Sequence, residues 1–169
     1  NQLMGWCQGE IQLGILKKLS GTAINRHDQE HGMVYSTSPP YELLQNKLIP
    51  FAQMQELKRM ARYWDLVYNS GNFRNTASLL WPDGDVFHGF LAFSSWLFGQ
   101  TRSTWKIALP RLAELLYQYL ITQKVADPSE IANHLAQDIL TVKGRVLPPV
   151  IREQVTCMPG KPHNLYRPL

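Results

Sequence analysis

The chain has 169 residues, 44% of them hydrophobic and 18% charged, proportions that suit one compact domain with a sizeable core. Its net charge of +4 comes from 17 basic and 13 acidic residues. The basic residues stand singly or in pairs such as Lys17-Lys18 and Lys58-Arg59, which argues against nucleic-acid binding. No run of about 18 uncharged apolar residues occurs, so the sequence predicts neither a membrane-spanning helix nor a membrane partner.

The N-terminal part is expected to form a strand-bearing arm over residues 1–49. Apolar side chains alternate weakly over residues 11–19, and this pattern predicts a β-strand. A turn and a short helix over 24–31 follow, and Gly32 suits the position just after a helix end. Residues 33–41 are expected to be extended because they contain two adjacent prolines. The residues after them fit either a short helix or an extended arm.

Residues 50–147 are expected to form a helical domain of five or six helices, because apolar residues recur there at helical spacing. Pro110 either kinks its helix or occupies the first turn. Asp127-Pro128-Ser129-Glu130 has the pattern of a capping box. The most apolar helix is expected to be central and buried. The predicted helices cover residues 50–68, 74–80, 86–98, 105–120 and 128–143.

A Pro-rich, largely extended tail is expected over residues 148–169, which contain five prolines at positions 148, 149, 159, 162 and 168. The predicted fold class is therefore mainly α. It is a helical bundle preceded by a short strand-bearing arm and followed by an extended tail.

One short segment has the residues of a metal site. His27-Asp28-Gln29-Glu30-His31 follows the H-x-x-E-H order of inverted zincin peptidases. On a helix, His27 and His31 share a face and could reach one metal ion, with Glu30 as the base. However, no distal third ligand stands out and the helix is short. A solvated charged turn is the preferred interpretation, and a small metallopeptidase stays open as an alternative.

Other polar residues give no catalytic assignment. Asp83 and Asp85 are expected to make turn and cap contacts, and paired carboxylates need a fixed spacing in a pocket for acid–base work. The lone histidines, His88 and His134, are expected to be structural. Arg59 and Arg62 stand in an aromatic–basic cluster with Tyr63 and Trp64. These arginines are expected to pack with their charged heads in solvent.

Five aromatic residues are candidates for a substrate pocket or an interface, although aromatics at helical spacing are more often core residues. They are Trp64, Tyr68, Phe87, Trp96 and Trp105.

The chain contains two cysteines, Cys7 and Cys157. Two free thiols in a reducing cytoplasm is the simplest interpretation, so a cytoplasmic protein is expected. Two cysteines are too few for an iron–sulfur cluster or an all-cysteine zinc site. No cofactor or metal ligand is therefore assigned in this chain.

Residues 125–147 also fit a helix-turn-helix. This keeps open a free-standing helical interaction or DNA-binding module. The second helix would present Asn133, His134, Gln137 and Asp138, which offers few phosphate contacts.

Four stretches occur in an order that resembles a known family. They are EIQLGILKKLSGTAI, EHGMVYSTSPPYELLQNKLI, LKRMARYWDLVYNSGNF and FHGFLAFSSWLFGQTRSTWKIALPRLAELLYQYL. They resemble the C-terminal portion of cobalamin-binding-domain radical SAM proteins, Fe–S oxidoreductases likened to magnesium-protoporphyrin IX monomethyl ester oxidative cyclases. The resemblance covers roughly residues 10–125. In those proteins this helical extension is described as a domain of unknown function.

The resemblance implies that residues 11–19 are the last strand of an upstream partial barrel. It also implies a parent enzyme that uses a [4Fe–4S] cluster, S-adenosylmethionine and cobalamin. The C-x-x-x-C-x-x-C loop of the family is missing from this sequence, so no ligand of those cofactors is assigned here. The expected role is a non-catalytic accessory domain whose partner is the barrel of the same polypeptide, which it caps or whose substrate access it shapes.

Overall fold

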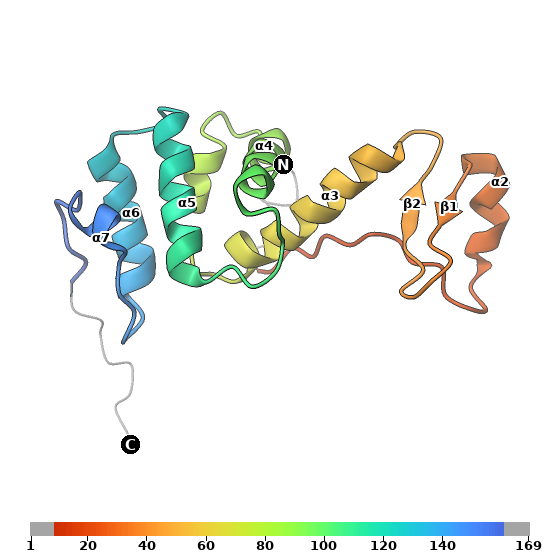
Figure 1. The fold of residues 1–169 in the computed structure, drawn as a ribbon, viewed down its shortest axis with the longest axis horizontal. Helices are drawn as coiled ribbons and strands as arrows, with labels where there is room; N and C mark the ends of the chain where they lie inside the picture. Colours follow the sequence, from red (N-terminus) through yellow and green to blue (C-terminus); the bar gives the residue numbers. More distant parts are fainter. Residues whose placement is uncertain (1–8, 161–169) are drawn as a thin grey trace, which may run out of the picture.

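Helix α3 (Phe51–Trp64) connects a small arm to a helical body, and the two lie at opposite ends of an elongated molecule (Figure 1). This is a computed structural model, and it describes residues 9–160. Over these residues the fold is mainly helical, with one two-stranded antiparallel sheet. The predicted fold class, a helical bundle with a short strand-bearing arm, is confirmed. None of the described helices combines the length and apolarity that a bilayer crossing requires.

The arm consists of η1 (Ala23–His27), α2 (Asp28–His31), β1 (Val34–Tyr35) and β2 (Leu43–Gln45). The two strands pair Val34 with Gln45 and Tyr35 with Leu43. Gly32 follows α2 with a φ of 57°, the left-handed conformation expected after a helix end. The predicted helix over 24–31 is thus confirmed as a short 3-10 turn that continues into one α-turn.

The predicted β-strand over residues 11–19 is wrong. The segment is extended, but its pairing is limited to one isolated antiparallel bridge between Lys17 and Glu42. It runs alongside α3 from the helical body to the arm (Figure 1). A strand needs a continuous ladder of backbone hydrogen bonds, and in the described residues the contact of this segment with the start of β2 does not extend into such a ladder.

At its C-terminal end, α3 continues into a π-helical turn, η2 (Asp65–Asn69). The side chains of Tyr63, Trp64 and Val67 are buried against the body. Gly71 ends this helical run with a φ of 69°, which agrees with the stop predicted there.

Helix α4 (Val86–Thr101) packs against α3 and the short helix η3 (Ala77–Leu80). Gly89 allows this close approach, because a Cβ atom at that position would lie 2.4 Å from the carbonyl oxygen of Leu80. Only one side of α4 is fully buried, and Phe87 on this helix is exposed. The expectation of a central, buried helix is therefore met on one side of α4 only.

Two further helices, α5 (Leu109–Thr122) and α6 (Pro128–Leu140), complete most of the core. Pro110 occupies the first turn of α5, so of the two predicted roles for this proline the kink is excluded. Asp127 and Pro128 begin α6 as predicted, but the Asp127 side chain makes no capping hydrogen bond. Helix α6 ends at Leu140, before the predicted stop at Gly144.

The prediction of an extended chain from Pro148 onward is wrong over α7 (Pro149–Arg152). Ile151 is completely buried, and Leu147 just before the helix is buried as well. Adjacent prolines fit here because Pro149 occupies the first helical position, where no backbone N–H is needed. Residues 161–169 of the predicted tail lie outside the described residues, and the domain borders at 49/50 and 147/148 stay predictions.

The buried carboxylate of Asp138 connects α6 to the start of η3. Its Oδ1 accepts hydrogen bonds from the backbone N and the Nδ2 of Asn75, at 2.9 and 2.8 Å. Its Oδ2 accepts from the backbone N and the Oγ1 of Thr76, at 2.9 and 2.7 Å. Asp138 therefore binds the turn just before η3, which is distant in sequence, and satisfies the backbone amides of Asn75 and Thr76 there.

Candidate functional site

The π-helical turn η2 anchors the start of the extended segment. The side-chain amide of Asn69 pairs with the backbone of Ile11, accepting from its N at 3.2 Å and donating to its O at 3.0 Å. Trp64 donates from Nε1 to the same carbonyl at 3.0 Å. Asp65 accepts from Asn69 Nδ2 at 2.9 Å and orients the amide. A turn of π-helix is common at functional sites, and here it aims Asn69 at another chain segment.

Backbone hydrogen bonds fix the other end of the segment to the arm. Leu43 donates from its backbone N to Leu16 O at 2.8 Å, and Lys18 donates to Tyr41 O at 2.9 Å. The ammonium group of Lys18 also forms an ion pair with Asp28, at 2.5 Å. The segment is thus held at both ends by two different parts of the fold.

Between these anchors, residues 12–15 make no backbone hydrogen bond to any part of the chain that the structure describes. Leu13 in this stretch and Leu16 just after it are exposed, with exposed fractions of 36% and 41%. An extended segment with free N–H and C=O groups and apolar side chains has the properties of an unpaired strand edge.

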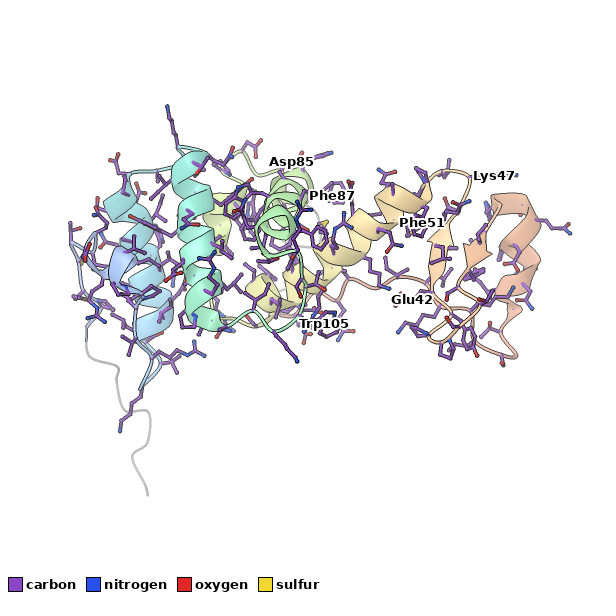
Figure 2. The ribbon with its side chains drawn as sticks, in the orientation of Figure 1. Glu42, Lys47, Phe51, Asp85, Phe87 and Trp105 are labelled. Atoms are coloured by element: carbon purple, nitrogen blue, oxygen red, sulfur yellow. The ribbon has the colours of Figure 1, made fainter. Side chains whose placement is uncertain are left out.

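A groove of about 1050 Å³ lies between this segment and α3. It is lined by residues 13–17, by mostly polar residues of α3, and by Phe98 and Trp105 among others. Figure 2 shows Glu42, near the sheet, and Trp105, near the helical body, and both residues line the groove.

Two arginines of α3 are held over aromatic rings in this groove. The Arg59 guanidinium lies 4.5 Å from the ring centre of Phe98, and that of Arg62 lies 4.4 Å from the ring centre of Trp105. Lys58 pairs with Glu42, whereas neither arginine forms an ion pair within residues 9–160. Arg62 Nε is buried without a hydrogen-bond partner in that same part of the chain. Stacked guanidinium groups of this kind are preorganised to bind a carboxylate or a phosphate.

The groove has the chemistry of a binding site. Its carboxylates already have partners, since Glu42 pairs with Lys58 and Asp65 accepts from Asn69. General acid–base catalysis needs a titratable side chain that is placed within hydrogen-bond reach of the reacting atom. The groove instead offers positive charge, aromatic surface and an open backbone edge.

The five predicted pocket aromatics do not gather in one place. Trp64 and Tyr68 stack at 4.4 Å between ring centres, in a cluster with Trp81 and Phe90. Trp96 instead packs against Phe93 and Tyr119. Phe87 is exposed beside His88 and away from Trp105 (Figure 2). Of the five, Trp105 alone is among the residues that line the groove. A pocket or interface role stays a prediction for the set.

Sequence reasoning expected the charged heads of both arginines in solvent, which is wrong for Arg62 because its Nε is buried, and it missed the role of Asn69. The spacing of Arg59 and Arg62 places both on one face of α3, and that spacing was the available signal. No local pattern indicates that Asn69 binds the backbone of Ile11, which lies 58 positions earlier in the chain.

The other predicted polar contacts have definite positions. Asp85 caps α4 by accepting from the backbone N of His88, and its second oxygen contacts the imidazole of His88 at 2.8 Å. Asp83 accepts from the backbone N of Asp85. These are the turn and cap contacts expected from the sequence. His27, Glu30 and His31 do come together, and one ligand atom of each lies within 4.8 Å of the others.

Residues 125–147 do not form a helix-turn-helix. Only α6 is a full helix there, and the next helix, α7, has four residues and lies beyond the segment. Asp138 is buried, and Asn133 binds Thr156 and Cys157 through its side-chain amide. Two of the four side chains expected to face DNA are therefore used inside the protein. Cys157 is free and exposed, whereas Cys7 lies outside the described residues.

Comparison with known proteins gives one match. The family described as "Protein of unknown function (DUF4080)" matches residues 29–167, and the chain belongs to this family. No curated protein and no solved structure matches the chain. The match runs from the arm through the helical body, and crosses both borders of the predicted helical domain.

Proposed function

We propose that this chain of the DUF4080 family is a non-catalytic accessory domain that docks on the radical SAM barrel of the same polypeptide. The observation that carries the proposal is the extended segment over residues 12–15, which is fixed at both ends and leaves its backbone unpaired within the described part of the chain. An edge of this kind is suited to add to a sheet. The occupant of the edge is then a strand of the barrel that the sequence resemblance implies.

The motifs of the resemblance support this role, because they build the anchors. Trp64, Asp65 and Asn69 belong to the stretch LKRMARYWDLVYNSGNF, and they fix Ile11. The stretch around Tyr41 fixes the other end. The shared residues thus hold the segment in place and do not form a reaction centre.

The groove provides the second part of the contact. Arg59 and Arg62 face it with no acidic partner in the described chain, so an anionic group of the barrel or of its substrate would complete the site. In this role the domain covers the barrel and limits access to it, as the resemblance implies.

The cofactors of such an enzyme do not belong to this chain. A [4Fe–4S] cluster that binds S-adenosylmethionine needs three thiolates, and this sequence contains two cysteines, at opposite ends. The residues present do not fit the cluster. In the proposal, the cluster, S-adenosylmethionine and cobalamin bind upstream in a cytoplasmic parent enzyme.

Amide hydrogen exchange tests the docking. In this chain alone, the amides of residues 12–15 should exchange much faster than those of Lys18 and Leu43, which are hydrogen-bonded. In a longer polypeptide that includes the upstream region, the same four residues should become protected. Equal exchange rates of residues 12–15 in both proteins would contradict the proposal.

A pair of variants makes the test specific. Leu13→Asp places a charge on the free edge and should abolish the protection in the longer protein, while the isolated chain keeps its stability. Leu48→Asp is the matched control, because Leu48 is 88% exposed and does not line the groove. It should leave both proteins unchanged. An upstream coding sequence without a C-x-x-x-C-x-x-C loop would instead favour an independent interaction module.

A further inference from the structure

His27, Glu30 and His31 present three metal-ligand side chains on one face of the arm. His27 ends η1, and the other two belong to α2. Positions three and four apart share a helix face. The imidazole ring centres lie 5.8 Å apart with an angle of 31° between the rings. One ligand atom from each residue lies within 4.8 Å of the other two.

These separations are close to those of a coordinated ion. Ligands at about 2.05 Å from a tetrahedral metal ion are about 3.3 Å apart, so the donor atoms must approach each other by at most about 1.5 Å. Side-chain rotation can supply this movement, because His31 and Glu30 are exposed, with side-chain fractions of 49% and 71%. The backbone need not move.

The backbone beneath the three side chains is already fixed. Met33 donates from its backbone N to Asp28 O at 2.9 Å, and Lys47 donates to His31 O at 2.9 Å. The α2 turn is thus closed by Gly32 and tied to the residues that follow β2. Such preorganisation lowers the entropic cost of bringing the ligands together.

The charges around the cluster favour a metal that binds imidazole strongly. Arg26 donates from Nε to His27 Nε2 at 3.0 Å, and the Lys47 ammonium group donates to Glu30 O at 2.6 Å. Both cations repel a dication. Hard ions such as Mg²⁺ prefer oxygen ligands, and a site with one carboxylate offers them too few oxygen atoms. Two imidazoles and one carboxylate suit Zn²⁺ and similar ions.

We propose that His27, Glu30 and His31 form a binding site for a borderline divalent transition-metal ion, with Zn²⁺ as the representative. Three protein ligands leave at least one coordination position open to water or to a donor from another molecule. The site lies at the end of the arm, far from the helical body (Figure 1). It is independent of the docking groove.

Calorimetric titration of the full chain with ZnCl₂ tests the site. The chain should carry Cys7→Ser and Cys157→Ser, so that thiolates do not compete. We expect one Zn²⁺ per chain, and His31→Ala should weaken binding by about tenfold or more, since it removes one of three ligands. Arg26→Ala should tighten binding, because it removes a competing cation from His27. If His31→Ala and Arg26→Ala only disturbed the fold, they would not change the Zn²⁺ affinity in opposite directions.

The control variants are His88→Ala and His134→Ala. Both replace histidines on other helices, α4 and α6, and should leave the affinity unchanged. Circular dichroism shows whether each variant stays folded. The proposal is overturned if Zn²⁺ does not bind, or if a folded variant with both His27→Ala and His31→Ala binds as tightly as the parent chain.

Discussion

Replacing Asp138 by alanine should be among the most damaging single changes in the helical body. The carboxylate is 7% exposed and accepts four hydrogen bonds from Asn75 and Thr76. Two of the donors are the backbone N–H groups of Asn75 and Thr76, just before η3, which make no other backbone hydrogen bond within the described residues. Alanine leaves the buried amide of Thr76 and the partly buried amide of Asn75 without partners.

The expected loss follows from the orphaned groups. Each buried N–H without an acceptor costs about 1–3 kcal/mol, so two of them give a loss of about 4 kcal/mol. The hydroxyl and side-chain amide donors can turn toward water, and we assign them no further cost. A domain of this size has a total stability of about 5–15 kcal/mol, so the variant should be folded but fragile.

Urea denaturation followed by circular dichroism measures the effect. With a slope of about 2 kcal/mol per molar urea, the midpoint should fall by about 2 M. Asp138→Asn keeps one acceptor oxygen and should lose about half as much. Glu153→Ala is the control, because this acid is exposed and should change stability by less than about 0.5 kcal/mol. A midpoint for Asp138→Ala within about 0.3 M of the parent protein would refute the reasoning.

Three further predictions follow from close contacts and burial. Gly89→Ala should destabilise by about 2 kcal/mol or more in urea denaturation, because the new Cβ would lie 2.4 Å from the Leu80 carbonyl oxygen; an unchanged midpoint would contradict the close approach. Asn69→Ala removes both hydrogen bonds to Ile11 and should cost about 1–2 kcal/mol, with faster amide exchange at Ile11; unchanged exchange there would show that the anchor is not needed. Burial raises the pKa of the Tyr63 phenol. The stability linked to this protonated phenol is therefore complete below about pH 10, and it is lost as the pH rises through the higher pKa of the folded state. Tyr63→Phe should therefore flatten the fall in the urea midpoint between pH 9 and pH 11, and an identical fall in both proteins would contradict this assignment.

Most of the helices could be predicted from local patterns. Apolar spacing, Pro128 at a first helical position and Gly71 after a helix end are signals that act within a few residues. They correctly located α3 and the start of α6, whereas α5 begins at Leu109, four residues after the predicted start at residue 105. The capping-box pattern at Asp127 correctly predicted where α6 begins, but the expected side-chain hydrogen bond is not formed. Such a pattern indicates where a helix can start and does not fix which donor the side chain binds.

The candidate site was harder to predict because its contacts connect distant positions. Residues 11–19 have a strand pattern, but a strand requires a neighbour, and in the described residues the segment is bound by the side chains of η2 and by the arm. The arginines looked like surface residues, and only the approach of Phe98 and Trp105 to α3 makes them part of a groove.

The sequence by itself determined the helical character of the chain, the main helix positions and the H-x-x-E-H cluster, because helix formation and side-chain spacing along a helix are local. The tertiary structure alone decided that Ile151 is buried, that Asp138 binds the distant turn before η3 and that residues 12–15 keep an unpaired edge within the described chain. These features depend on which segments meet in space. Burial and hydrogen-bond pairing between residues some 60 positions apart leave no periodic trace in the sequence.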